Sequence, residues 1–242
     1  MAYCDGKDTL FPGKVRITDL LNPRYISRKP IYDFLEKNAE IAEGDMLDFG
    51  CGSMQYKTIF TNKGRIRSYE GLDVKSADKF GLHADNITYY DGVHIPFANN
   101  MFDIVMAVEV FEHVENLDKV IDEICRILKQ NGKLIVTVPM TFPLHMKPYD
   151  FRRFTCFGLK NYLKEHGFTN IQIEPSTPMD STLRRLKIYH WESKTPRLIE
   201  WRIFKLYVMY ANMRFLISQK TKRDVRGAVM PIDWLVCCSK ED

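Results

Sequence analysis

Hydrophobic residues of this chain gather in short runs that predict β-strands. Seven runs are expected to be strands: Met46–Phe49, Ser68–Val74, Ile87–Tyr90, Phe102–Val108, Lys133–Val138, Thr169–Glu174 and Ile232–Cys238. The fourth and fifth runs are apolar at nearly every position, which is typical of strands buried on both faces of a parallel sheet. The pattern therefore predicts a buried, largely parallel sheet.

Between these runs, apolar side chains recur at helical spacing. The clearest helix follows Asn116 and precedes Gly132, and its apolar positions are Leu117, Val120, Ile121, Ile124 and Leu128. Further helices are expected at about 31–42, at 155–166, and through most of the long segment before the last strand. Residues 1–30 carry several prolines and glycines, which predicts little regular structure there.

Strands that alternate with helices predict an α/β protein with a Rossmann-like, doubly wound, mostly parallel seven-stranded sheet and helices on both faces. The 242 residues suit a single domain. We expect a lead-in (1–30), a cofactor-binding core (31–175), a helical insertion or cap (176–229), and a final strand with its tail (230–242). Ligands of such sheets bind at the carboxyl ends of the strands, so candidate chemistry is sought there.

A glycine-rich turn follows the first expected strand, where residues 47–54 read Leu-Asp-Phe-Gly-Cys-Gly-Ser-Met. Gly50 and Gly52 permit positive φ and a close approach of a ligand to the backbone. A dinucleotide site would have a third glycine where this chain has Gln55. Asp48 is a poor neighbour for a pyrophosphate, so this turn favours a cationic or ammonium-bearing ligand instead.

Carboxylates also follow the next two expected strands. Asp73 closes the second strand, where a carboxylate can accept hydrogen bonds from both hydroxyls of a ribose. Asp91 and Gly92 come directly after the third strand, within reach of an adenine edge. Together with the glycine turn, these residues predict a nucleoside-binding site.

From about Met46 to Glu174 the motifs resemble those of class I S-adenosylmethionine-dependent methyltransferases, of the type 11-like group. The matching segments stand in family order: 47–52, Ile95-Pro96-Phe97, 102–105, Glu112-His113-Val114 and 126–133. Residues 50–53 with Tyr56 and Phe60, and later residues 143–145 and 148–155, look more narrowly like a bacterial subgroup that is associated with glycan or surface-polysaccharide biosynthesis. The chain departs from the family at Met54, where many members have a third glycine, and at Asn131, where Gly or Pro is usual.

The resemblance implies S-adenosylmethionine as the cofactor and assigns a role to each matching position. Asp48, Gly50, Cys51 and Gly52 would line its methionine end, Asp73 would bind the ribose, and Asp91 with Gly92 would meet the adenine. Glu109, at the end of the fourth strand, would face the methionine part or the acceptor. The alternative for Glu109 and for Glu112 is that both are solvated residues after a strand.

Methyl transfer to a hydroxyl also needs a base, because an alcohol is a poor nucleophile until its proton leaves. Candidate bases are His113, His145 and Asp150. A histidine with the ordinary pKa near 6.5 would suit the loop that holds His145. The alternatives are a capping or packing role for His113 and a surface role for His145. Tyr149 and Arg152 are candidates to bind a sugar, phosphate or carboxylate, unless they belong to a solvated loop.

The expected function is S-adenosylmethionine-dependent methyl transfer to a small-molecule or glycan acceptor, with a hydroxyl of a sugar or lipid-linked sugar preferred. The alternative is a non-catalytic cofactor-binding or scaffold protein with the same fold. A nucleic-acid substrate is not expected, because the net charge is only +4 and no Asn-Pro-Pro-Tyr-like tetrad is present. No metal is expected, since the six cysteines show no zinc-ligand spacing.

The location expected from the sequence is cytoplasmic, because residues 1–14 lack the apolar core of a signal peptide and no long apolar span is present. Residues 198–226 combine large apolar and aromatic side chains with basic flanks. Such a segment can lie in a membrane interface, here at the inner face. The alternative is that it packs on the protein's own core or on a second subunit of a homodimer.

Overall fold

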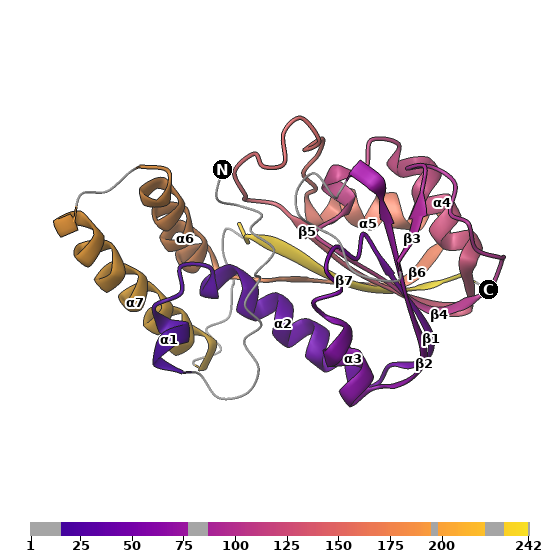
Figure 1. Cartoon of the computed structure of the whole chain (residues 1–242), viewed down its shortest axis with the longest axis horizontal. Coiled ribbons are helices and arrows are strands. Elements are labelled where there is room, and N and C mark those ends of the chain that lie inside the picture. The colour runs from indigo at the N-terminus through magenta and orange to yellow at the C-terminus, as the bar shows by residue number, and fades with distance from the viewer. Residues whose placement is uncertain (1–15, 77–86, 195–197, 221–229, 242) are drawn as a thin grey trace.

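The computed structural model describes residues 16–76, 87–194, 198–220 and 230–241 (Figure 1). Its centre is a seven-stranded sheet in the order β3-β2-β1-β4-β5-β7-β6. The strands are β1 (Glu43–Phe49), β2 (Arg65–Val74), β3 (Thr88–Tyr90), β4 (Phe102–Val108), β5 (Leu128–Pro139), β6 (Phe168–Pro175) and β7 (Asp233–Lys240). Strand β7 runs antiparallel to β5 and β6 and the other pairs are parallel, which confirms the expected mostly parallel sheet.

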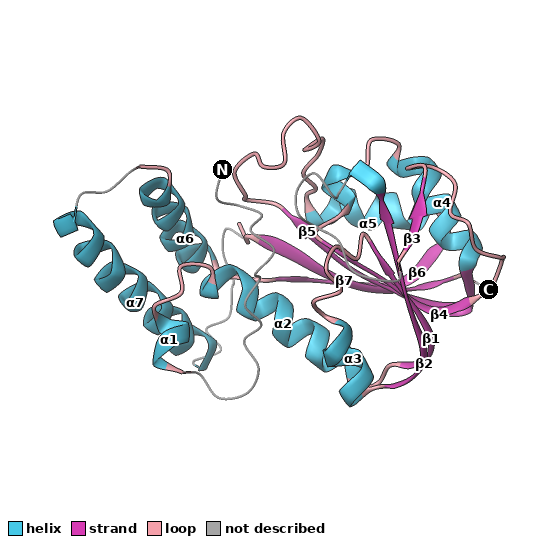
Figure 2. Ribbon diagram, in the orientation of Figure 1, coloured by secondary structure: helices cyan, strands magenta, loops and turns pink. Residues whose placement is uncertain are grey.

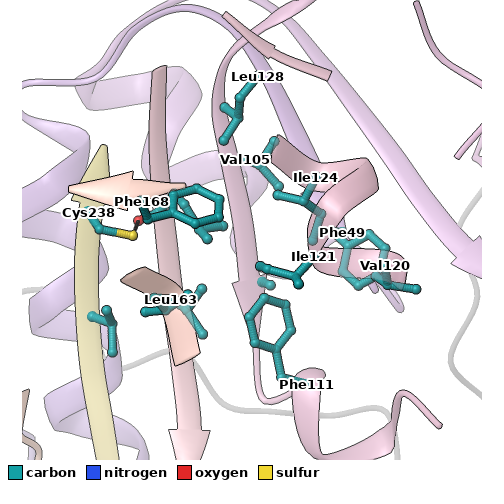
Figure 3. Close-up of a cluster of buried hydrophobic side chains, with 14 of the residues drawn as sticks. Phe49, Val105, Phe111, Val120, Ile121, Ile124, Leu128, Leu163, Phe168 and Cys238 are labelled. Carbon is teal, nitrogen blue, oxygen red and sulfur yellow. Dashed lines mark hydrogen bonds between the residues drawn. The ribbon is translucent and has the colours of Figure 1, made fainter. Parts of the chain in front are cut away.

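Helices cover both faces of this sheet, as expected (Figure 2). Helices α2 (Tyr25–Ala39) and α3 (Lys57–Lys63) pack on one face, and α4 (Leu117–Ile127) and α5 (Cys156–Glu165) pack on the other. Figure 3 shows Val120, Ile121 and Ile124 of α4 gathered near Phe49 and Val105 of the sheet. Burial of each such side chain stabilises the fold by about 1.5–3 kcal/mol, so the helical periodicity of this segment has a direct energetic cause.

The segment before residue 31 differs from its expectation. A short helix α1 (Ile17–Leu20) lies there, and α2 begins at Tyr25 and continues through Pro30. Pro30 removes one intrahelical hydrogen bond. Tyr25 and Ile26 are nevertheless fully buried against the C-terminal helices. The expectation of little regular structure is therefore wrong for residues 17–20 and 25–30, because tertiary burial outweighs the local preference of proline.

Two helices stand between β6 and β7, as the sequence predicts: α6 (Met179–Glu192) and α7 (Leu198–Lys220). They lie at the end of the molecule opposite β1 and β2, beside α1 (Figure 1). Their shared core includes Ile188, Phe204 and Phe215 and continues into Tyr25 of α2. The basic residues expected to follow α7, from Lys222 to Arg226, lie outside the described residues. Among the described helices, none is long and apolar enough to cross a membrane.

Candidate active site

The turn after β1 has a backbone conformation that favours glycine at two positions. Gly50 has φ +69° and Gly52 has φ +49°, which is the left-handed region that side chains disfavour. A Cβ added to Gly50 would also come within 2.5 Å of Val110 Cγ2. The backbone N–H of Gly50 donates to the carbonyl of Leu72, at 2.8 Å, and ties the turn to β2. The turn thus presents bare backbone at the carboxyl edge of the sheet.

Asp73, at the end of β2, is bonded to the same turn. Its Oδ2 accepts the N–H of Gly52 at 2.9 Å, and its Oδ1 accepts the N–H of Val74 at 2.7 Å. The carboxylate is buried yet reaches the cavity described below. Asp73 therefore shapes the glycine turn as well as facing the place where a ribose is expected.

Asp48 lies behind the turn rather than at the surface of the cavity. It is buried, and its Oδ2 accepts a hydrogen bond from the hydroxyl of Tyr69 at 2.7 Å. Burial, with a smaller contribution from Asp73, raises the pKa of Asp48 to about 7. Cys51 is also buried, and Asp48, Cys51 and Gly52 do not line the cavity. These residues support its wall from behind.

A cavity of about 460 Å³ opens at the carboxyl ends of the strands, a size typical of ligand sites. The sequence-predicted site residues that line it are Gly50, Asp73, Asp91, Gly92, Glu109, His113 and Tyr149. Gly92 has φ +92° with open space where a Cβ would lie, so a ligand can approach its backbone. The structure thus brings residues that end or follow five different strands into one cavity.

Asp91 already has partners within its own turn. Its Oδ1 accepts the backbone N–H groups of Val93 and His94, and its Oδ2 lies 2.8 Å from the His94 ring. These hydrogen bonds, that of the His94 side chain foremost, hold the pKa of Asp91 well below its ordinary value. The carboxylate is therefore ionised and fixed in orientation at the edge of the cavity.

Glu109 and Glu112 are not the solvated residues that the sequence left open. Glu109 has φ +56°, and its Oε1 accepts the hydroxyl of Thr137 at 2.8 Å. Glu112, on the short helix η2 (Phe111–His113), is 1% exposed. Burial raises the pKa of both carboxyls. Glu112 was not among the expected site residues; its place directly before His113 was the available signal.

The two candidate histidines form one unit. His113 Nε2 lies 3.1 Å from His145 Nε2, although the residues come from η2 and from the loop after β5. Only His113 lines the cavity, with His145 behind it. Burial lowers the pKa of His113, and burial with the neighbouring His113 lowers the pKa of His145 to about 4. The expectation of an ordinary pKa at His145 is wrong, and both rings are neutral at pH 7.

Asp150 holds His145 in place. Its Oδ2 accepts the backbone N–H of His145 at 3.0 Å and an N–H of Arg153 at 2.8 Å. Burial alone would raise the pKa of Asp150, but these hydrogen bonds outweigh it and the net shift is downward. The geometry indicates that Asp150 orients His145 and does not itself reach the cavity.

Arg152 lies outside the cavity and binds backbone instead. Its guanidinium donates to the carbonyls of Phe111, Val114 and Glu115. It lines a smaller hollow, beside Asn116 and Tyr162. These hydrogen bonds fasten the segment after β5 to the turn that carries Glu112 and His113. The contacts support a structural role for Arg152.

Comparison with known proteins agrees with this geometry. Residues 47–136 match the model of a methyltransferase domain. An uncharacterised protein of Methanocaldococcus jannaschii is 30% identical over 143 residues, which cover 54% of this chain and 68% of that protein. The chain belongs to the class I S-adenosylmethionine-dependent methyltransferase family, whose cofactor is S-adenosylmethionine. With three other curated relatives, the match spans 26–40% of their length.

Solved structures show the same fold. The [4+2]-cyclase SpnF is 19% identical, with a TM-score of 0.56 and coverage of 89% of this chain and 82% of that one. Phosphoethanolamine N-methyltransferase 2 of Haemonchus contortus, in complex with S-adenosyl-L-methionine, is 16% identical with a TM-score of 0.53, and the match covers 96% and 61% of the two chains. At these identities the likeness concerns the fold alone.

Proposed function

We propose that this chain binds S-adenosylmethionine in the 460 Å³ cavity and transfers its methyl group to a hydroxyl of a small molecule, a sugar or a lipid-linked sugar. The observation that carries the proposal is the composition of the cavity. The expected cofactor residues Gly50, Asp73, Asp91 and Gly92 share it with His113 and Tyr149, the expected acceptor residues. The preference for a glycan acceptor is supported by the resemblance of residues 143–155 to the glycan-associated subgroup.

The residues present fit the cofactor. Bare backbone at Gly50 and Gly92 leaves room for close approach, and the Asp73 carboxylate can accept ribose hydroxyls while it holds the turn. The bound cofactor supplies an electrophilic methyl group on a sulfonium. The protein aligns the acceptor with that carbon and excludes water, and such alignment accounts for much of the rate in transfers of this kind.

The acceptor hydroxyl is proposed to lie against His113. Among the three candidate bases, His113 is the one that lines the cavity, and Glu112 and His145 stand behind it. This group of side chains would ease removal of the hydroxyl proton. The cap adjoins the same place, because the Phe142 ring contacts both His145 and Tyr189 of α6, each with ring centroids 4.9 Å apart. We propose that the cap (176–229) shapes the acceptor end of the cavity.

Cofactor binding is tested by calorimetric titration with S-adenosylmethionine. We expect the wild type to bind and Asp73→Ala to bind about tenfold to 100-fold more weakly, because charge-assisted hydrogen bonds contribute roughly 1.5–3 kcal/mol each. Asp122→Ala, an exposed carboxylate paired with His166, is the matched control and should bind like the wild type. Equal affinity of Asp73→Ala and the control would refute the ribose role of Asp73.

Catalysis is tested separately from binding. Protein loaded with methyl-labelled S-adenosylmethionine is offered sugar nucleotides and polyprenyl-linked sugars, and label is followed into aqueous and solvent-extractable products. Incorporation into a glycan product supports the proposal. Specific cofactor binding without transfer to any acceptor would favour the non-catalytic alternative.

We further propose that α7 pairs with α7 of a second copy. Phe204, Val208, Ala211 and Phe215 bury one face of this helix in the protein's own core. On the opposite face, Ile203, Leu206, Tyr210, Met213 and Ile217 are 47–62% exposed. These five residues, here called the outer stripe, repeat at intervals of three and four, which is the spacing of a coiled-coil seam.

Charge favours an antiparallel pairing of the two helices. Glu200 and Arg214 flank the outer stripe on the same side and stand two heptads apart. Antiparallel self-pairing that matches Ile203 with the partner's Met213 sets Glu200 beside the partner's Arg214, twice by symmetry. Binding to a membrane surface requires neither the regular three-and-four spacing of the outer stripe nor the pairing of Glu200 with Arg214. We therefore propose a second copy of the chain as the partner of this face.

A further inference from the structure

Three side chains converge beside the cavity: Glu112, His113 and His145. His113 Nε2 lies 3.1 Å from His145 Nε2, and Glu112 Oε1 lies 3.5 Å and 3.8 Å from these two nitrogens. Two imidazoles and a carboxylate are a ligand set that divalent transition metals prefer. Among the described residues, this is the one group of histidine, cysteine and acidic side chains with such mutual proximity.

The hydrogen bonds of the two rings decide which nitrogen carries a proton. His113 Nδ1 lies 2.6 Å from the carbonyl of Tyr149, and His145 Nδ1 lies 3.3 Å from the carbonyl of Pro143. A carbonyl oxygen accepts only, so each neutral ring carries its proton on Nδ1. The lone pairs of both Nε2 atoms then face one another across 3.1 Å. That arrangement is repulsive unless a proton or a metal ion lies between the two nitrogens.

Glu112 provides an independent reason for a cation at the same point. Its side chain is 1% exposed, and neither carboxylate oxygen has a hydrogen-bond partner. A buried carboxylate without a partner is costly, whereas a coordinated metal ion would compensate its charge. Because Oε1 faces both Nε2 atoms, one ion can satisfy the carboxylate and separate the two lone pairs.

We propose that Glu112, His113 and His145 bind a zinc ion. Bonds of about 2.0–2.1 Å at tetrahedral angles place ligand atoms about 3.3–3.4 Å apart, and the three observed separations of 3.1, 3.5 and 3.8 Å bracket that value. Magnesium and calcium prefer oxygen ligands alone. The proposal replaces the expectation of no metal, which rested on cysteine spacing and took no account of histidines that meet only in the fold.

The surroundings match those of a coordinated metal. The Tyr149 and Pro143 carbonyls, with Asp150 Oδ2 at 3.3 Å from His145 Nδ1, orient the two rings from behind, as partners of metal-bound histidines do. His113 lines the cavity, so the fourth position of the ion would face the expected acceptor. There the ion would lower the pKa of a bound hydroxyl. This last step rests on the proposed function, whereas metal binding itself does not.

The test uses the full chain after removal of metals with a chelator. Zinc is titrated in competition with a chromophoric chelator, and bound metal is counted by mass spectrometry. We expect one zinc per wild-type chain, with at least about 100-fold weaker binding for Glu112→Gln and for His145→Ala. His166→Ala is the matched control, because His166 also lies beside carboxylates, those of Asp118 and Asp122, but at the surface. It should bind zinc like the wild type.

Two further readouts separate a built site from adventitious binding. Cobalt in place of zinc should give the intense visible absorption of a tetrahedral site in the wild type and in His166→Ala, but not in Glu112→Gln. Zinc should raise the thermal midpoint of the wild type and leave that of folded Glu112→Gln unchanged, while magnesium raises neither. Equal zinc affinity of the wild type and Glu112→Gln, or loss of binding in His166→Ala, would overturn the proposal.

A separate titration distinguishes failure of the proposed metal site from failure of the proposed function. S-Adenosylmethionine is titrated into the metal-free wild type, whose cofactor residues Asp73 and Asp91 are not among the three proposed metal ligands. Cofactor binding without zinc binding overturns the metal site and leaves the methyltransferase proposal standing. Zinc binding without cofactor binding supports the metal site and overturns the methyltransferase proposal.

Discussion

Met54 is held in a backbone conformation that its side chain disfavours. Its φ of +51° lies in the left-handed region, at a cost of roughly 1–2 kcal/mol for a residue with a Cβ. The same position carries a third glycine in many members of the family. Here the methionine side chain lies over Gly71, where a Cβ would come within 2.2 Å of Met54 Cε. The two residues are therefore coupled across the turn.

This coupling predicts a non-additive pair of substitutions. Gly71→Ala should destabilise the wild type by about 1–3 kcal/mol through overpacking. In the Met54→Gly background it should cost less, because the nearest of the crowding atoms is gone, although Cys51 Sγ and Ile87 Cγ2 still lie 2.9 and 3.0 Å from the new methyl group. Free energies of unfolding from urea titrations of the four proteins measure the coupling. Strictly additive effects would contradict the proposed contact.

Asp48 makes stability depend on pH. Its pKa in the folded chain is about 7 against an ordinary 3.8, because the carboxyl is buried and Asp73 lies near. Because the pKa is higher in the folded chain than in the unfolded chain, folding favours the protonated carboxyl. The stability that depends on this protonation is fully present below about pH 4 and is lost as the pH rises toward 7. At 1.36 kcal/mol per pKa unit, a shift of roughly three units corresponds to about 4 kcal/mol.

Asp48→Asn tests that contribution. The amide keeps an acceptor for the Tyr69 hydroxyl but does not ionise, so the variant should gain stability relative to the wild type between pH 4 and pH 7. The measurement is the difference between the two free energies of unfolding across that range. The other buried carboxyls with raised pKa values are present in both proteins, so their effects on stability cancel in this difference. A constant difference would contradict burial of an ionisable Asp48.

At the scale of an element, α7 is apolar on two opposite faces. The large apolar and aromatic side chains that the sequence shows in this segment are divided between these two faces. Phe204 and Phe215 pack inward, whereas Leu206 and Tyr210 face outward. The alternative that the segment packs on the protein's own core is therefore confirmed for the inner face. The outer stripe is the face for which we propose a second copy as the partner.

Dimerisation through α7 is tested by sedimentation velocity. Replacing both Leu206 and Met213 by Glu should convert the proposed dimer to monomer and raise its dissociation constant by at least about 100-fold. Burial of each of these side chains stabilises the dimer by about 1.5–3 kcal/mol, and each occurs once in each copy. Ile41→Glu, at an exposed isoleucine far from α7, is the control and should remain dimeric. Glu200→Arg should weaken the dimer, and adding Arg214→Glu should restore it. A monomeric wild type that floats with anionic liposomes would instead favour membrane contact.

At the scale of the whole molecule, the two cap helices pack with the start of α2 and with Ile232 in a third hydrophobic cluster, beside the two that pack on the sheet. Tyr25 of α2 packs edge-on against Phe215 of α7, with ring centroids 6.3 Å apart, and Ile232 before β7 joins the same cluster. The cap helices thus contact α2, near the start of the described residues, and Ile232, near their end. It should unfold together with the sheet.

Phe215→Ala tests this connection. The phenylalanine is nearly fully buried, so its truncation should cost about 3–5 kcal/mol of stability. Because this cluster joins the cap helices to α2 and to the residue before β7, urea unfolding should stay a single transition. Far-UV circular dichroism and tryptophan fluorescence, which senses Trp191 and Trp201 in the cap and Trp234 in the sheet, should give coincident curves. Separate transitions in the wild type would show that the cap is an independent unit.

Local patterns sufficed for much of the fold. The apolar run Phe102–Val108 coincides with β4, and the periodicity from Leu117 locates α4, because a buried face imposes its spacing on the residues that line it. The expected boundary between this helix and the next strand is wrong, since α4 ends at Ile127 and β5 already begins at Leu128 rather than at Lys133. The segment around Tyr25 and Pro30 was mispredicted for the converse reason. Its helix depends on contacts with α7, which lies far along the chain.

By itself, the sequence determined the sheet, the glycine turn at Gly50 and the carboxylates at the strand ends, because each depends on neighbours close in the chain. Only the tertiary structure decided burial and convergence. In the folded chain Asp48 is buried and Arg153 donates a hydrogen bond to Asp150. His113 and His145, which follow different strands, have their Nε2 atoms 3.1 Å apart. The pKa of a group and the ligands of an ion depend on what surrounds a point in space. That surrounding comes from segments far apart in sequence, and no local pattern encodes it.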